Sequence, residues 1–266
     1  MVEFAFMRLA LVASAAMGAA LGLIGVYLVI RRVVFLGLVL ANVATVGAAA
    51  AEVLGWSSEI ASVTTAVAAA LGFGLVRRPR RVSDESLMGW AYAAASAAPV
   101  LILAAASAPD ADALHMLFGN VLAVSGIHTV GLVVVALGIG LAHVLFARRF
   151  LLVTFDADGA QVAGVNTRLW SLGLNLLVGV AAAAAVHEIG ALLTFALLTL
   201  PAMAALLVTT NMRATFLTAA GLGATLPCLG LGVSFYFDLP AGPASVALLS
   251  ASVLVAAAVG HFSSSR

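Results

Sequence analysis

Two neighbouring ionisable residues, His187 and Glu188, interrupt a long apolar stretch in the second half of this sequence. Imidazole is a common ligand for zinc and carboxylate for manganese, so the pair carries the donor atoms of a divalent metal site. Ionisable residues inside a membrane are candidates for function because each is costly to bury in lipid. Successive residues on a helix point about 100° apart, so both side chains face one ion only if Gly190 breaks the helix. The alternative is that the pair marks the outer end of a membrane span, where headgroups hydrate it.

Other patterns that carry catalytic chemistry are missing from the sequence. His-Glu begins the zinc-protease pattern His-Glu-x-x-His, but Ala191 stands where the second histidine is needed. All 12 basic residues are arginine, so there is no lysine for a phosphate-binding loop of the type G-x-x-x-x-G-K-S/T. Most acidic residues lie between the apolar runs rather than inside them. We therefore expect that the chain is not an enzyme, and that a partner chain hydrolyses any ATP.

Four further polar residues inside or beside apolar runs have simpler interpretations. His128 and His143 lie near the ends of one apolar run, and an interface position explains them. Asn42 and Asn175 are amides within apolar runs, where hydrogen bonding between helices is the favoured role. None of these four is predicted to be a metal ligand, apart from a weak oxygen contribution from Asn42.

The composition defines the class of protein. Of 266 residues, 64% are hydrophobic and 9% charged, whereas a soluble domain is roughly 45–50% apolar. A bilayer core of about 30 Å takes roughly 20 apolar residues per helix. Cutting the sequence at charged and turn residues gives spans at 4–30, 33–54, 60–76, 87–106, 127–146, 172–186, 191–208, 214–235 and 244–259. The first run is too long for a signal peptide and is expected to stay as a span.

These runs predict an all-α, polytopic membrane helix bundle that forms one transmembrane domain over residues 1–266. The number of spans is eight or nine, because the break at His187 reads either as a turn between two spans or as a kink or re-entrant turn. Arginines concentrate in cytoplasmic segments of membrane proteins, so Arg31, Arg148 and Arg168 place the N-terminus outside. The net charge of +1 leaves no basic footprint for nucleic acid.

The segment 154–170 is the longest stretch whose composition forbids burial in lipid, and it falls on the cytoplasmic side. Asp156 and Asp158 fit the N-cap and the first turn of a helix. Gly164 and then Asn166 fit its end, which predicts a helix of only two turns. A short cytoplasmic helix between two spans suits the transmission of force from a soluble partner.

Several stretches resemble one family. FDADGAQVAGVN at 155–166 resembles the D-x-x-x-A-x-x-x-G-V coupling helix of bacterial ABC-importer permeases, the segment that sits in a groove of the ATPase subunit. The stretches RRVVFLGLVLANVATVG at 31–47, LFGNVLAVS at 117–125, IGALLTFALLTLPAMAA at 189–205 and FDLPAGPASVALL at 237–249 are similar to permeases of the zinc and manganese importers, in that family's order and spacing.

The resemblance implies a multi-pass permease of the bacterial cytoplasmic (inner) membrane, surrounded by lipid and assembled as a homodimer. It also implies a separate ABC ATPase subunit that binds ATP, a periplasmic or lipoprotein solute-binding protein, zinc or manganese as cargo, and no cofactor held by this chain. The residues that it assigns to ATPase coupling are Asp156, Asp158, Ala160, Gly164 and Val165.

The sequence departs from the family at one important place. The metal importers carry Gly-Asp-x-x-x-His in the second span, which puts a carboxylate and an imidazole on one helix face. Here the Asp position is Leu38 and the His position is Asn42, and leucine has no donor atom. We expect Leu38 and Asn42 to line the substrate pathway without forming that site. Either His187 and Glu188 supply metal ligands instead, or the permease serves another solute, or it is a non-transporting partner that relays the state of the ATPase.

Overall fold

The computed structural model describes residues 5–75, 82–106 and 126–264, and every regular element within them is a helix. The helices are α1 (Ala5–Ile30), α2 (Val34–Leu54), α3 (Ser58–Leu75), α4 (Asp84–Ala105), α6 (Gly126–Phe155), α7 (Ala157–Val162), α8 (Thr167–Ile189), α9 (Ala191–Val208), α10 (Met212–Phe237) and α11 (Ala241–Ser264). The arginine-rich run at 77–81, the acidic segment at 107–116 and the LFGNVLAVS stretch lie outside the described residues.

Nine of the described helices are long and apolar enough to cross a membrane, which confirms the all-α bundle and the larger of the two predicted span counts. Gly190 decides between a kink and a turn. It has φ 80° and ψ 160°, a backbone conformation that essentially only glycine adopts. This one residue ends α8 and begins α9, so the break after His187 separates two complete spans.

The membrane helices on either side of α7 are longer than the apolar runs predicted. The sequence placed the end of the fifth span at 146 and the start of the sixth at 172, but α6 continues to Phe155 and α8 begins at Thr167. Arginine side chains can lie along an apolar helix while their charged ends reach water or an aromatic ring. The Arg149 guanidinium lies 4.9 Å from the centroid of the Trp170 ring. Charged residues at the edge of the membrane therefore do not end these helices.

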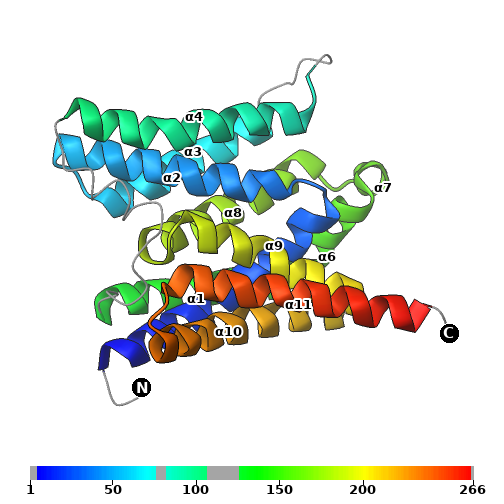
Figure 1. Ribbon diagram of the computed structural model, residues 1–266. Helices are drawn as coiled ribbons and strands as arrows, with labels where there is room; N and C mark the ends of the chain where they lie inside the picture. Colours follow the sequence, from blue (N-terminus) through cyan, green and yellow to red (C-terminus); the bar gives the residue numbers. More distant parts are fainter. Residues whose placement is uncertain (1–4, 76–81, 107–125, 265–266) are drawn as a thin grey trace.

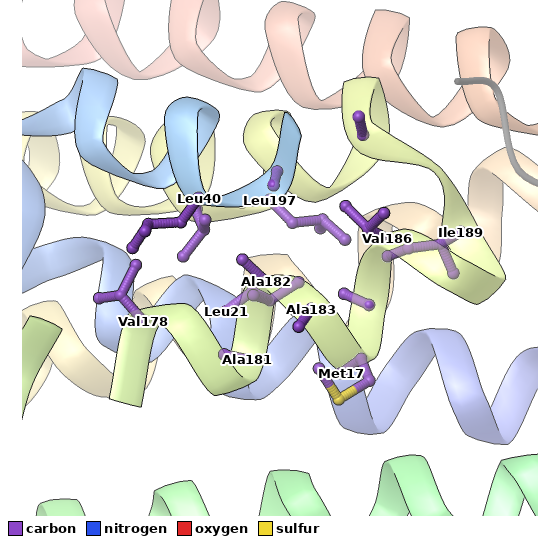
Figure 2. Close-up of a cluster of buried hydrophobic side chains, with 14 of the residues drawn as sticks. Met17, Leu21, Leu40, Val178, Ala181, Ala182, Ala183, Val186, Ile189 and Leu197 are labelled. Atoms are coloured by element: carbon purple, nitrogen blue, oxygen red, sulfur yellow. The ribbon is translucent and has the colours of Figure 1, made fainter. Parts of the chain in front are cut away.

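The centre of the bundle is built from small and aliphatic residues of α1, α2, α8 and α9. Figure 2 shows Met17 and Leu21 of α1 packed with Leu40 of α2, Leu197 of α9 and a run of alanines on α8. At the crossing of α1 and α10, a Cβ atom added at Gly18 would meet the carbonyl of the facing helix. Such close approach of backbones is how membrane helices gain packing energy in the absence of a hydrophobic drive between them.

Two ends of the bundle carry the candidate sites (Figure 1). The end with α7 also carries Arg148 and Arg149, so it is the cytoplasmic end by the distribution of arginine. The opposite end holds the turn between α2 and α3, the start of α6 and the turn between α8 and α9. Three helices that are distant in sequence thus present their outer ends together.

Candidate functional site

The cytoplasmic site is the short helix α7, whose start is capped as the sequence predicted. An oxygen of the Asp156 side chain, Oδ1, accepts a hydrogen bond from the backbone N–H of Gly159 at 2.8 Å. Asp158 lies in the first turn, where a carboxylate is favoured by the helix dipole. Both acids therefore stabilise the N-terminus of a helix that has only 6 residues.

The end of α7 is equally well defined. The N–H of Val165 donates to the carbonyl of Ala160 at 2.9 Å, and the N–H of Gly164 donates to the carbonyl of Gln161 at 3.1 Å. This pair of bonds is a Schellman motif, which needs a left-handed residue, and Gly164 has φ 77°. Asn166 was predicted to belong to this stop, and that prediction is wrong. Its side chain accepts from the N–H of Leu169 at 3.1 Å and caps the start of α8.

The side chains of α7 divide into an inner and an outer set. Ala160 is buried and Val165 is half-buried, so they fix α7 against the ends of the spans. Val162 is 91% exposed, although it is a large apolar residue at the tip of a cytoplasmic loop. An exposed apolar side chain on a rigid, capped helix is suited to contact with another protein.

The second site is a cavity of about 320 Å³ at the outer end of α3, α6 and α8. Its polar wall consists of Glu59 from α3, His128 from α6, and His187 and Glu188 from α8. The remaining wall is apolar and comes from Val63, Ile127, Gly131, Leu132, Val135, Ala183 and Ala184. The cavity therefore places two carboxylates and two imidazoles over the apolar interior of the bundle.

One imidazole joins the two carboxylates. The Nδ1 atom of His128 lies 2.6 Å from Oε1 of Glu188, and its Nε2 atom lies 3.1 Å from Oε1 of Glu59. A neutral imidazole has only one N–H, and an ionised carboxylate only accepts. With both carboxylates ionised, both contacts are hydrogen bonds when the ring carries a proton on each nitrogen. The ring of His128 then occupies the space between two negative charges.

The two residues that the sequence analysis proposed as metal ligands have different surroundings in the structure. His187 and Glu188 both line the cavity, but Glu188 contacts His128, and His187 is exposed on the cavity wall. His128 was interpreted as an end-of-span residue and Glu59 as part of an outer loop, so neither was proposed as a ligand. Over the described ranges, no group of three or more His, Cys, Asp and Glu side chains is arranged so that it could hold a metal ion. With the N-terminus outside, alternation of the nine predicted spans puts all four residues on the outer side, which was the available signal.

Asn42, which replaces the family's histidine, joins the second span to a neighbouring helix. Asn42 is buried, its Nδ2 donates to the carbonyl of Leu38 at 2.9 Å, and its Oδ1 accepts from the hydroxyl of Ser96 in α4 at 3.2 Å. The predicted interhelical hydrogen bond of Asn42 is thereby confirmed. Leu38 is half-buried. A role for these two residues in lining the pathway stays a prediction.

Comparison with known proteins identifies the family. The model of the ABC 3 transport family matches residues 3–260. The chain belongs to the ABC 3 transport family. A solved structure described as PsaBC from Streptococcus pneumoniae in complex with Fab has a chain that superposes with a TM-score of 0.86 at 23% identity, covering 96% of this chain and 91% of that one. That likeness confirms the permease fold.

Two sequence relatives match nearly the whole of this chain. The manganese transport system membrane protein MntC of Halalkalibacterium halodurans is 31% identical over 261 residues, which cover 97% of this chain and 88% of the relative. The protein of the same name from Listeria innocua is 29% identical over 246 residues, which cover 92% of this chain and 88% of that relative. Our protein is thus a multi-pass ABC permease subunit of the bacterial cytoplasmic membrane, not an enzyme. Membership in an ABC family implies an ATPase and a solute-binding protein as partners.

Proposed function

We propose that this permease imports a divalent metal ion, manganese or zinc, with energy from a separate ATPase subunit. The observation that carries the proposal is α7, a rigid helix with a cap at each end and an exposed apolar tip, held between two spans at the cytoplasmic end. The manganese relatives, matched over nearly the whole chain, support metal as the cargo. The carboxylates and imidazoles of the outer cavity support it independently, since they are the donors that these metals use.

In the proposed contact between α7 and the ATPase, each of the five predicted coupling residues has a role. Asp156, Asp158 and Gly164 shape the helix through its caps, whereas Ala160 and Val165 fix it to the spans. The ATPase binds the exposed side of α7, and ATP stays in that partner. We infer that two copies of this chain form the pathway with two ATPase subunits, and that a solute-binding protein delivers the cargo to the outer end.

Uptake in proteoliposomes tests this proposal. Vesicles containing the permease, its ATPase and its solute-binding protein should accumulate radioactive manganese only when ATP is supplied, and zinc should compete. Vesicles with an ATPase that cannot hydrolyse ATP are the matched control and should show background uptake. ATP hydrolysis without accumulation of either metal would overturn metal import.

A second candidate function is supported by the second span. The family's metal pair is absent at Leu38 and Asn42, and the amide of Asn42 is engaged in packing α2 against α4. Such a permease would carry another solute or relay the state of the ATPase without transport. The double variant Leu38→Asp with Asn42→His distinguishes metal import from this second candidate function. If metal is the cargo, the restored pair should increase metal retention; if it is not, the variant should hold no more metal than the parent.

A further inference from the structure

We propose that Glu59, His128 and Glu188 form the entry site for the divalent cation, at a cavity that His187 also lines. The inference rests on the proposed function and adds the ligands and their location. The site lies at the outer ends of α3, α6 and α8. It therefore differs in helix and in depth from the position in α2 where the family pattern expects ligands.

The fold brings together donors that are distant in the sequence. Glu59 is in the first turn of α3, His128 is in the first turn of α6, and Glu188 is in the last turn of α8. Each of these helices begins or ends at the outer face, so their terminal residues meet there (Figure 1). A donor on each of three helices can surround an ion, whereas adjacent residues of one helix cannot.

The charge of the cluster favours a cation. Two carboxylates face the cavity, and no arginine is among the described residues that line it. The Glu188 side chain is only 12% exposed, whereas that of Glu59 is 58% exposed. Burial of a carboxylate beside an apolar wall strengthens its attraction for a cation, because the local dielectric is low. Glu59 is thus suited to capture an ion from water, and Glu188 to hold it at the membrane edge.

The contacts of His128 show how close the proposed donors lie to one another. Its ring lies between the two carboxylates, at 2.6 Å from Glu188 and 3.1 Å from Glu59. When a cation replaces the proton on one ring nitrogen, that proton passes to water, and the nitrogen and the carboxylate that it contacted become donors to the ion. Oxygen and nitrogen donors together suit manganese and zinc, whose preferences lie toward carboxylate and imidazole respectively. The cavity of about 320 Å³ has room for the ion with bound water.

Metal binding to the assembled permease and ATPase, measured without ATP, tests this site. Equilibrium dialysis against radioactive manganese should show binding by the parent, with zinc as competitor. Glu59→Gln, His128→Gln and Glu188→Gln should each weaken binding at least about tenfold, since losing even a supporting group at a metal site costs that much. Glu52→Gln is the matched control, because Glu52 is an exposed glutamate near the outer end of α2 that does not line the cavity. Its binding should equal that of the parent.

The outcomes separate the site from the proposed function. Parent-like binding by all three variants, or no binding by the parent, would overturn the entry site. Weakened binding in these variants supports the site even if uptake fails, in which case only the import proposal falls. Uptake that continues unchanged in the three variants counts against the site while import stands. Gel filtration of each variant with its ATPase confirms folding, and the loss of the free-manganese paramagnetic resonance signal gives a second measure of binding.

Discussion

Replacing Gly164 by valine should uncouple ATP hydrolysis from transport. Gly164 has φ 77° at the end of α7, and the left-handed conformation costs an L-residue about 1–2 kcal/mol. That penalty lowers the population of the capped helix roughly 5- to 30-fold. A helix of 6 residues has too little stability of its own to offset this penalty, because isolated helices under about 12 residues are marginally stable. The spans should still insert and pack, since no neighbouring atom lies within 4 Å of a Cβ added at this position.

The assay compares ATP hydrolysis and metal uptake in the same vesicles for three proteins. Gly164→Val should retain hydrolysis at or below the parent rate and lose most uptake. Gly164→Asn should behave much like the parent, because asparagine tolerates the left-handed conformation. Gly138→Ala, a change in open space on α6, controls for the general effect of losing a glycine. Equal coupling in the valine and asparagine variants would refute the reasoning, because backbone strain at the end of α7 would then have no effect on coupling.

Three further predictions concern packing and topology. Ser96→Ala and Asn42→Ala should couple in a double-mutant cycle by about 0.6 kcal/mol, the mean for hydrogen bonds between membrane helices; a thermal-unfolding cycle with no coupling would remove this bond from the account. Gly18→Leu should destabilise the crossing of α1 and α10 by about 1–3 kcal/mol through overpacking, and an unchanged melting temperature in detergent would contradict that contact. In a background without the native cysteine, Trp56→Cys should react with an impermeant reagent from outside and Val162→Cys only from the cytoplasm; the reverse labelling would invert the topology.

Much of the fold was readable from the lengths of apolar runs. The span at 191–208 agrees with α9 residue for residue, because glycine on one side and polar residues on the other end it sharply. The ends of α6 and α8 near α7 could not be predicted from the sequence. Arginines were taken as the end of a span, but Arg149 remains in the helix with its guanidinium over the ring of Trp170. Asn166 was ambiguous for another reason. Asparagine fits both the stop of one helix and the cap of the next, and only the backbone geometry distinguishes them.

The candidate sites were readable to different degrees. The coupling helix is local, so Asp156 and Gly164 revealed both of its ends. The outer cavity depends on which helices lie side by side, and run lengths carry no information on lateral packing. Glu188 was therefore predicted, whereas its contact with His128 and the proximity of Glu59 required the structure.

The number of metal ions moved for each ATP hydrolysed tests the central claim most directly. Vesicles with the parent permease, its ATPase and its solute-binding protein should show a constant, non-zero ratio of manganese accumulated to ATP consumed. The ratio should fall toward zero in Gly164→Val while hydrolysis continues. A parent that hydrolyses ATP in response to its solute-binding protein and moves no metal ion would contradict import, and would instead identify the permease as a relay or as the carrier of another solute.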